Sequence, residues 1–344
     1  MKTLSCIIPS YNSAKFLDKG IGSFLDPGII DRLDIIIVND GSTDDTPVVA
    51  QKFCDRYPDS VRLINQVNKG HGGALNTGCA AAVGKYLKVI DAEDWVETAN
   101  LEYFLDQLEA CESDVVLTHH YTRDISNGEV KKWMSYPKEP GRSYTLEEIM
   151  ADWKSFDRSL TFHGITYKTD FYHKYGIQLS EHVFYEDHEF ATFPCCYAKS
   201  VTPMDIFIYD YRIGDVLQSV SNENQLKRVG HTETVLKRMI TEAAALKLPK
   251  KCGGREYVAM KAQGLLLSYL TTVMLVEKDK RKGRRKGEAM MRRFRTKLPR
   301  TAQLAEQQYR IFCMLNRMHI SKTTFERVLR SRLYNMVRHN HDFK

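Results

Sequence analysis

Short apolar runs alternate with helical patterns through the first part of the chain. Leu4–Pro9 and Asp34–Val38 are almost wholly apolar, which is typical of strands that are buried on both faces of a parallel sheet. Val61–Asn65 and Tyr86–Ile90 have the same character, and helically spaced apolar residues lie between consecutive runs. This alternation predicts an α/β fold with a doubly wound, mostly parallel sheet.

Other segments have less regular patterns. Asn68–Gly73 is rich in glycine and predicts a flexible loop, followed by a helix over Ala74–Val83. Residues 119–145 are polar and contain proline and glycine, so we expect them to be irregular. Lys278–Lys286 is strongly basic with little apolar content, and it predicts an exposed linker between helices.

Three carboxylates, those of Asp91, Glu93 and Asp94, follow the strand expected at Tyr86–Ile90. Like charges this close raise one another's pKa, and burial adds to the effect. Clustered carboxylate oxygens suit a hard divalent cation such as Mg²⁺ or Mn²⁺, which also binds substrate phosphates. The same residues fit a solvated acidic turn ahead of a helix that starts near Thr98, so both interpretations stay open at this point.

Polar loops follow three of the predicted parallel strands. These loops are Pro9–Asn12, Asp40–Asp45 and Asp91–Asp94. Ligands of such sheets bind beyond the carboxyl ends of the strands. We therefore expect the three loops to converge on one crevice.

The charge is unevenly distributed along the chain. The net charge is +7, but residues 1–220 carry 21 basic and 33 acidic side chains, whereas residues 221–344 carry 29 and 10. This asymmetry predicts two parts with different roles, an α/β domain over 1–222 and a basic α-helical C-terminal region over 223–344.

The cysteines and apolar runs indicate a cytosolic protein. The eight cysteines form no C-x-x-C pair, which argues against a zinc ribbon or a thioredoxin motif and favours a reducing compartment. Gly264–Val276, the longest apolar run, is shorter than the ~20 residues that span a bilayer. Leu4–Ile8 is too short for the core of a signal peptide. We expect a soluble or peripherally attached protein.

Six short motifs occur together in the sequence. They are Ile-Ile-Pro-Ser-Tyr-Asn at 7–12, Val-Asn-Asp-Gly-Ser-Thr-Asp at 38–44, Asn-Lys-Gly at 68–70, Asp-Ala-Glu-Asp at 91–94, Tyr-Glu-Asp at 185–187 and Tyr-Arg at 211–212. In this order and spacing they resemble the family-2, inverting nucleotide-sugar glycosyltransferases of the GT-A fold. The resemblance covers roughly residues 3–222, and it implies a nucleotide-sugar half at about 1–118 and an acceptor half at about 119–222.

The resemblance implies a UDP-sugar donor. Pro9, Tyr11 and Asp40 match the positions that hold the base, and an aspartate can accept the N3 hydrogen of uracil. Arg212 and Ser219 match a segment that closes over the diphosphate. The full set of residues expected to bind the nucleotide-sugar is Pro9, Tyr11, Asn12, Asp40, Gly70, His71, Asp91, Glu93, Arg212 and Ser219. A solvated loop histidine is an equally good interpretation of His71.

The resemblance also implies a metal ion and a catalytic base. Asp94, Glu93 and Asp91 match the positions for the metal, Mn²⁺ or Mg²⁺, and for the ribose. The family more often has aspartate at the position of Glu93, which leaves the division of roles among the three open. Asp187 matches the base that takes a proton from the acceptor hydroxyl, and it also fits the N-cap of a helix. His163 fits the acceptor side or a structural role.

The sequence therefore predicts a metal-dependent inverting glycosyltransferase. It would move a hexose or N-acetylhexosamine from a UDP-sugar to a hydroxyl of a glycan or lipid-linked glycan, in the synthesis of bacterial surface polysaccharide or glycoconjugates. One alternative is a sugar nucleotidyltransferase, although Pro9–Ser13 is not the glycine- and lysine-rich phosphate loop that such an enzyme needs. The other is a non-catalytic glycosyltransferase-like binding protein.

The basic C-terminal region predicts attraction to an anionic surface, such as the inner face of the plasma membrane or an acidic acceptor. A helical bundle with a solvated basic face explains the same charges. Helical spacing predicts one apolar face, formed by Leu304, Ile311, Leu315 and Met318. We expect no nucleic-acid partner because no recognition motif is present. The sequence is compatible with an oligomer.

Overall fold

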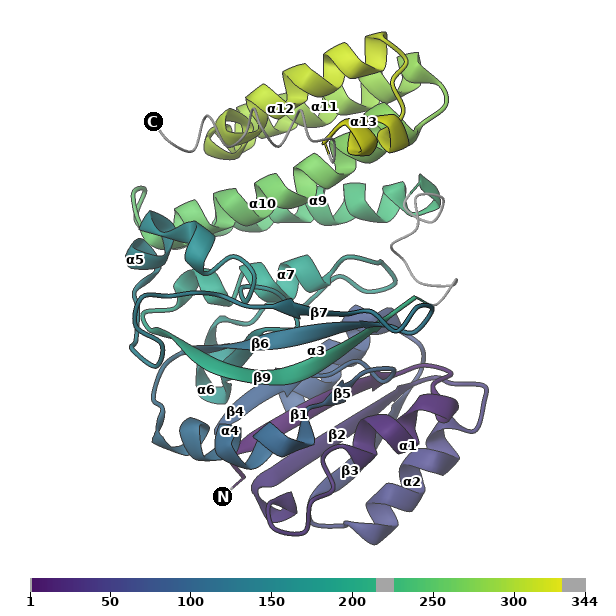
Figure 1. The fold of residues 1–344 in the computed structure, drawn as a ribbon, viewed down its shortest axis with the longest axis vertical. Helices are drawn as coiled ribbons and strands as arrows, with labels where there is room; N and C mark the ends of the chain where they lie inside the picture. Colours follow the sequence, from purple (N-terminus) through teal and green to yellow (C-terminus); the bar gives the residue numbers. More distant parts are fainter. Residues whose placement is uncertain (1, 215–225, 330–344) are drawn as a thin grey trace. The chain divides into compact units, whose positions relative to one another are not determined.

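The structure is a computed structural model that describes residues 2–214 and 226–329. The chain forms two compact units, the first with Met1–Gln218 and Lys247–Val258 and the second with Ser219–Leu246 and Ala259–Lys344. The first unit contains the sheet, and the second contains the long C-terminal helices (Figure 1).

The segment 247–258 belongs to the first unit, which a sequence-based division at residue 222 does not anticipate. The Tyr257 hydroxyl donates a hydrogen bond to the Ala191 carbonyl at 2.6 Å, and both Tyr257 and its surroundings are buried. Gly254 lies so close to the Cys196 carbonyl that a Cβ there would be 2.1 Å from the oxygen. These contacts join residues that lie far apart in the sequence.

The N-terminal half of the first unit is a parallel sheet, as predicted from the alternating apolar runs. Its strands are β1 (Leu4–Ser10), β2 (Leu33–Asp40), β3 (Val61–Gln66) and β4 (Tyr86–Val89), in the order β3-β2-β1-β4. The helices between them are α1 (Ala14–Gly22), α2 (Thr46–Arg56) and α3 (Gly70–Ala81), with a 3-10 helix at Ile30–Arg32. Every residue of β1 and β2 is buried, which explains their continuous apolar character.

The second half of this unit extends the sheet with strands of mixed direction. Its elements are β5 (Trp95–Val96), α4 (Thr98–Ala110), β6 (Val115–Asp124), β7 (Val130–Trp133), α5 (Leu146–Ala151), β8 (Ile165–Lys168), α6 (Thr169–Tyr175), α7 (Asp187–Thr192) and β9 (Val201–Ile213), with 3-10 helices at Trp153–Ser155 and Cys195–Tyr197. The sheet continues as β4-β8-β6-β9-β5, and β7 pairs with β6. β8 is antiparallel to both of its neighbours, whereas β6 and β9 are parallel.

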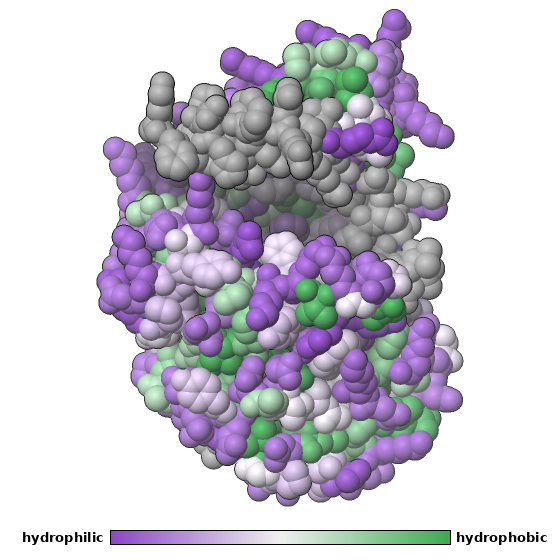
Figure 2. All heavy atoms as spheres, in the orientation of Figure 1, coloured by the Kyte–Doolittle hydropathy of each residue, from purple (hydrophilic) through white to green (hydrophobic). Residues whose placement is uncertain are grey.

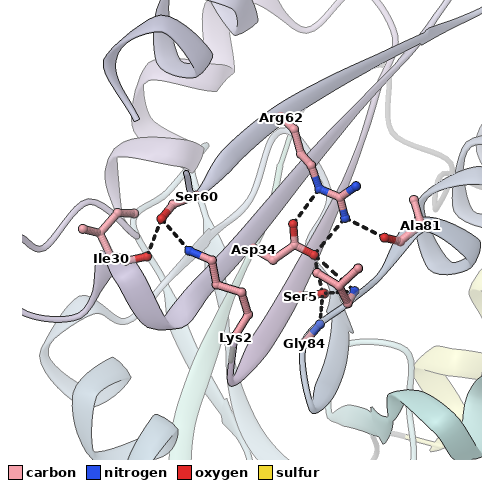
Figure 3. A network of polar contacts seen from close by, with 9 residues as sticks. Lys2, Ser5, Ile30, Asp34, Ser60, Arg62, Ala81 and Gly84 are labelled. Atoms are coloured by element: carbon pink, nitrogen blue, oxygen red, sulfur yellow. Dashed lines mark hydrogen bonds and ion pairs between the residues drawn. The ribbon is translucent and has the colours of Figure 1, made fainter. Parts of the chain in front are cut away.

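A network of hydrogen bonds and an ion pair links the amino ends of the parallel strands (Figure 3). Arg62 binds both carboxylate oxygens of Asp34, at 2.7 and 3.0 Å, and also donates to the Ala81 carbonyl. Ser5 donates to Asp34 at 2.6 Å and accepts from the Gly84 amide at 2.9 Å. The network joins β1, β2 and β3 to the chain that leaves α3, at the edge of the sheet opposite the polar loops.

Two of the predictions for this unit are wrong. The expected loop Asn68–Gly73 is helical from Gly70 onward, as the first turn of α3. Residues 119–145 are not wholly irregular, because β6 runs to Asp124 and forms a hairpin with β7. All four residues of β7 are exposed, so the strand lacks the apolar alternation by which a strand is recognised in a sequence.

The second unit consists of helices. They are α9 (Val229–Ala245), α10 (Gly253–Thr271), a π-helical turn (Thr272–Val276), α11 (Lys280–Lys297), α12 (Pro299–Arg317) and α13 (Lys322–Leu329). α10 begins in the first unit and ends in the second. Gly253–Val276 is the one segment of the described chain that is long and apolar enough to cross a membrane, and 61% of its most apolar window is buried within the protein.

Two predictions for the C-terminal region are also wrong. The expected linker Lys278–Lys286 is largely the start of α11, because the Asp279 carboxylate caps the helix by accepting hydrogen bonds from the Arg281 and Lys282 amides. The buried face of α12 is not the predicted one. It consists of Thr301, Ala302, Ala305, Tyr309, Phe312 and Asn316.

The predicted face of α12 is instead partly exposed. Ile311 and Met318 are exposed, as is Met314 beside them. Figure 2 shows apolar surface among hydrophilic side chains on this unit. The buried face of α12 contacts α11, since the Tyr309 hydroxyl donates to Glu288 at 2.6 Å and Arg284 donates to the Asn316 side chain at 2.5 Å.

We predict that Gly78→Ala destabilises the first unit. A Cβ at Gly78 would lie 2.4 Å from Ile7 Cγ2 and 3.1 Å from Val38 Cγ2, where α3 packs on β1 and β2. Such overpacking costs about 1–3 kcal/mol. The midpoint of urea unfolding should fall accordingly. Gly22→Ala is the control, because Gly22 ends α1 with nothing within 4 Å of a Cβ. A loss of stability equal to that of the control would contradict the packing argument.

Candidate active site

A cavity of about 350 Å³ lies at the carboxyl ends of β1 and β2, beside the first turn of α3. It is lined by Pro9, Ser10, Tyr11, Asp40, Asn68, Gly70, His71, Ala74, His182, Val183 and Phe184. Five of the residues predicted to bind a nucleotide-sugar therefore line this cavity, namely Pro9, Tyr11, Asp40, Gly70 and His71. His182, Val183 and Phe184 were not predicted, because they precede the Tyr-Glu-Asp motif and are not part of it.

The carboxylate of Asp40 is held in a fixed orientation inside this cavity. The residue is only 2% exposed. Its Oδ1 accepts hydrogen bonds from the Gln66 amide at 2.7 Å and from the Lys69 main-chain N–H at 2.8 Å. Because the described residues hydrogen-bond only to Oδ1 of this carboxylate, Oδ2 is available to a donor in the cavity.

Tyr11 and Asn12 have different surroundings on the neighbouring loop. Tyr11 is 53% exposed at the rim of the cavity. Asn12 adopts a left-handed backbone conformation with φ 51°, which asparagine tolerates better than most residues. Its side chain accepts a hydrogen bond from the Thr43 amide at 2.8 Å, and its own amide donates to Ser42. Asn12 thus joins the loops after β1 and β2, and it does not line the cavity.

The glycines of α3 allow the helix to pack closely against the segment that precedes α7. A Cβ on Gly72 would lie 2.2 Å from the Ser180 carbonyl oxygen, and one on Gly70 would lie 2.8 Å from the His182 amide nitrogen. The His182 amide donates to the Lys69 carbonyl at 3.0 Å. This close packing explains why a glycine-rich stretch is helical here despite the low helix propensity of glycine.

His71 lies between two carboxylates. Its Nε2 is 2.9 Å from Asp91 Oδ1 and its Nδ1 is 2.5 Å from Glu186 Oε1. Burial opposes protonation of His71, but Asp91 and Glu186 outweigh it and raise the pKa of the imidazole well above its usual value. The charge of His71 in turn outweighs burial at Asp91 and lowers the pKa of that carboxyl. His71 is therefore a structural cation and not a solvated loop residue.

Asp91, Asp94 and His163 form a cluster of possible metal ligands, with one donor atom of each within 4.8 Å of the others. Asp94 is 1% exposed and accepts hydrogen bonds from the Tyr209 hydroxyl at 2.6 Å and the Arg212 amide at 2.7 Å. Burial raises the pKa of Asp94 well above its usual value, and the neighbouring carboxylates raise it further. A divalent cation would relieve this repulsion, so the donor set fits such an ion.

Glu93 lies outside this cluster, although the sequence placed it among the metal ligands. Burial and the charge of Asp91 raise the pKa of the Glu93 carboxyl. His163 takes its place in the cluster. Its ring stacks on Tyr211 at 4.3 Å, and burial lowers its pKa to about 4, which leaves the imidazole neutral with a nitrogen lone pair for a metal.

Lys88 is a further residue near the cluster to which sequence analysis gave no role. It is fully buried in β4, and burial lowers its pKa to about 7. A lysine within an otherwise apolar strand is the signal that could have drawn attention to it.

Asp187 is the first residue of α7 and is half-buried. Its charge acts on His163 and Tyr211, which places it near the cluster. In the described part of the chain no hydrogen bond engages the Asp187 carboxylate, whereas its neighbour Glu186 is bound to His71. Asp187 is therefore the carboxylate of this segment that is available to a ligand.

Arg212 reaches the site through its main chain. Its amide binds Asp94, and its guanidinium lies 4.9 Å from the centre of the Phe16 ring. Ser219, which was also predicted to contact the nucleotide-sugar, lies outside the described residues.

The comparison with protein families agrees with the motifs. Residues 5–171 match the family described as Glycosyl transferase family 2. An uncharacterized glycosyltransferase of Nostoc is 38% identical over 128 residues, which cover 37% of this chain and 38% of that protein. The chain spans about half, or less, of the length of the first curated relatives that it matches.

Solved structures show the same fold at low sequence identity. TarS 1–349 of S. aureus, in a crystal structure with UDP-GlcNAc, has a TM-score of 0.65 and 18% identity, and 93% of each chain is covered. The mannosyltransferase PcManGT of Pyrobaculum calidifontis, in complex with GDP-Man and Mn²⁺, has a TM-score of 0.51 and 18% identity over 91% of this chain and 84% of that chain. The predicted GT-A fold, with a helical C-terminal region, is confirmed.

We predict that Tyr209→Phe destabilises the site. The hydroxyl donates to the buried Asp94 carboxylate at 2.6 Å and accepts from the Asp91 amide at 3.1 Å. Its removal leaves buried polar groups unpaired and should lower the free energy of unfolding by about 1–3 kcal/mol. Tyr211→Phe is the control, since no hydrogen bond to the Tyr211 hydroxyl occurs within the described residues. Equal urea-unfolding curves for the two variants would refute the prediction.

Proposed function

Because residues 5–171 belong to glycosyl transferase family 2, we propose that the chain is a metal-dependent inverting glycosyltransferase with a UDP-sugar donor. The observation that carries this proposal is the arrangement of the site. A cavity suited to a nucleotide, a buried cluster of possible metal ligands and an available carboxylate lie at the same edge of the sheet.

The uridine assignment rests on Asp40. Two hydrogen bonds fix the carboxylate, so its second oxygen can accept the N3 hydrogen of uracil without reorganisation. Guanine would present a different pattern of donors and acceptors to it. The exposed ring of Tyr11 can stack on the base at the rim. A UDP-hexose or UDP-N-acetylhexosamine agrees with the UDP-GlcNAc bound by the structural neighbour TarS.

Asp91, Asp94 and His163 would hold Mn²⁺ or Mg²⁺. The bound ion would neutralise charge on the diphosphate as it leaves. Within the chain, Tyr209 and the Arg212 amide hold Asp94, and His71 holds Asp91. His71 also lines the cavity.

Asp187 would act as the base. An acceptor hydroxyl attacks the anomeric carbon from the side opposite the leaving UDP, its proton passes to the carboxylate, and the configuration inverts. Asp187 is half-buried at the start of α7. The neighbouring buried carboxylates Glu186 and Glu189 are both engaged in hydrogen bonds.

The acceptor would be a hydroxyl of a glycan or lipid-linked glycan, in bacterial surface polysaccharide or glycoconjugate synthesis. The aromatic side chains of the acceptor half support a sugar ligand, because sugar rings pack on aromatic faces. Trp133, exposed on β7, lies parallel to His120, which in turn lies 5.1 Å from His163. The cysteines are all free thiols in the structure, which fits a cytoplasmic location.

We predict that UDP binds more tightly than GDP or ADP in calorimetric titrations with Mn²⁺, and that a chelator weakens its binding. Asp40→Asn should weaken UDP binding roughly 10- to 100-fold, because a hydrogen bond to a charged group contributes about 1.5–3 kcal/mol. Asp45→Asn, at an exposed carboxylate of the same loop, should bind UDP normally. GDP binding as tight as that of UDP would remove the uridine assignment.

We predict that Asp187→Asn lowers turnover by roughly 10²–10⁴-fold, the usual contribution of a positioned base. The affinity for UDP should hardly change, since asparagine keeps the size of aspartate and Asp187 is the first residue of α7 and not its N-cap. Release of UDP from a panel of UDP-sugars, with water as the acceptor, measures the effect. Glu181→Gln, at an exposed carboxylate before α7, is the control. Near-normal turnover of Asp187→Asn would exclude this residue as the base.

We also predict salt-dependent binding of the chain to anionic membranes. The exposed basic residues of α11 are Arg281, Lys282, Arg285, Arg292, Arg293, Arg295 and Lys297. Each basic residue near an anionic surface contributes about 1 kcal/mol, and salt screens the attraction. Sedimentation with phosphatidylglycerol-rich vesicles at low salt should remove the protein from solution, whereas phosphatidylcholine vesicles or high salt should not. Met314→Asp should weaken the binding. Protein that stays in solution under all conditions would refute membrane attachment.

A further inference from the structure

Lys88 is a buried lysine whose amino group has no carboxylate partner among the described residues. It lies within β4 and is 1% exposed. Its Nζ donates to the main-chain carbonyl of His163 at 2.7 Å and to that of Ile165 at 3.2 Å. Transfer of an ammonium group out of water is costly, and two neutral carbonyls compensate it less well than a carboxylate does. Burial of a lysine at this position therefore lowers the stability of the fold, and this loss indicates a functional role for the residue.

The two hydrogen bonds from Lys88 connect β4 to the segment 163–165, beyond the point where the main-chain pairing of β4 with β8 ends. β4 and β8 pair only at Tyr86–Lys168 and Leu87–Tyr167. Beyond that point the Lys88 side chain, and not the main chain, joins β4 to the segment 163–165. From the other side the Thr118 amide donates to the Gly164 carbonyl at 2.9 Å. The segment that carries His163 is thus held from both sides.

This anchoring engages the main-chain carbonyls of His163 and its neighbour Gly164. No hydrogen bond engages the ring nitrogens of His163 within the described residues, and the ring packs against those of Tyr211, Tyr209 and His120 at centroid distances of 4.3, 4.9 and 5.1 Å. One ring nitrogen must stay within 4.8 Å of donor atoms of Asp91 and Asp94. Outer residues that orient a metal ligand commonly affect metal affinity as strongly as 10- to 100-fold.

We propose that Lys88 is a positioning residue that holds the His163 imidazole against Asp91 and Asp94, so that His163 serves as the third protein ligand of a divalent cation. The inference rests on the proposed function, in which this cluster binds Mn²⁺ or Mg²⁺. It assigns a role in cation binding to two residues outside the acidic motif of the sequence.

The direction of the change in cation affinity distinguishes a positioning role of Lys88 from a purely electrostatic one. Lys88→Met keeps the length and the packing of the side chain but removes its charge and its donors. Loss of a positive charge near the cluster would by itself strengthen cation binding. Loss of the anchor would release the segment 163–165 and weaken it. Weaker binding by Lys88→Met is therefore the specific result of positioning.

The experiment is a titration with Mn²⁺ alone, followed by the electron paramagnetic resonance signal of the free ion. We expect His163→Ala and Lys88→Met each to weaken Mn²⁺ binding by at least about tenfold. In the double variant Lys88→Met should have no further effect, because it acts through His163. Lys85→Met is the matched control, since Lys85 pairs with Glu112 away from the cluster. Lys88→Arg, which keeps the charge and donors, should bind Mn²⁺ more tightly than Lys88→Met.

A spin-echo measurement on the wild-type protein gives a test that needs no variant to fold. With ¹⁵N-labelled histidine, the Mn²⁺ signal should show coupling to one imidazole nitrogen. Absence of this coupling would overturn the assignment of His163 and with it the role of Lys88.

The remaining outcomes separate this inference from the proposed function. If Lys88→Met binds Mn²⁺ as tightly as the wild type, or if its effect is equally large without His163, positioning by Lys88 is wrong while the metal-dependent function stands. If the wild-type protein does not bind Mn²⁺ with or without UDP, both the metal role and this inference fail.

Discussion

The imidazole of His71 lies between carboxylates that come from opposite halves of the first unit. Asp91 follows β4 in the N-terminal half, and Glu186 precedes α7 in the second. Without the cation between them, two largely buried negative charges would repel each other at the centre of the site. With a positive charge on His71, both carboxylates bind the same imidazole, which holds α3 close to the start of α7. The cavity, the metal cluster and Asp187 all border this point, so their arrangement depends on the charge of His71.

Much of the fold could be predicted because fully buried strands have continuously apolar sequences. β1 and β2 are buried along their whole length and are apolar along their whole length. The positions of Asp40 and Asp91 at the ends of strands followed from the same pattern, since a parallel sheet has one binding edge. Here local sequence and global fold agree, and the prediction needed no knowledge of distant contacts.

The parts that were missed depend on contacts between distant residues. The first turn of α3 contains glycines that local propensity assigns to a loop, and only packing against Ser180 and His182 makes it helical. The basic start of α11 lacks apolar spacing, and the Asp279 cap with a buried opposite face decides its structure. The place of His163 in the cluster could not be predicted from the acidic motif, because His163 lies far from Asp91 and Asp94 in the chain. A pattern in one segment cannot contain such information.

The packing of α3 on the segment before α7 also has a consequence for how the two proposed substrate sites are connected. Asn76 exchanges two hydrogen bonds with the main chain of Leu179, and residues 182–184 form one wall of the cavity. Asp187 lies three positions after Phe184 of that wall, so the cavity wall and Asp187 are parts of one short, anchored segment. Under the proposed function, a donor in the cavity would contact the same segment that presents Asp187 to an acceptor, so the two substrate sites would share one structural element.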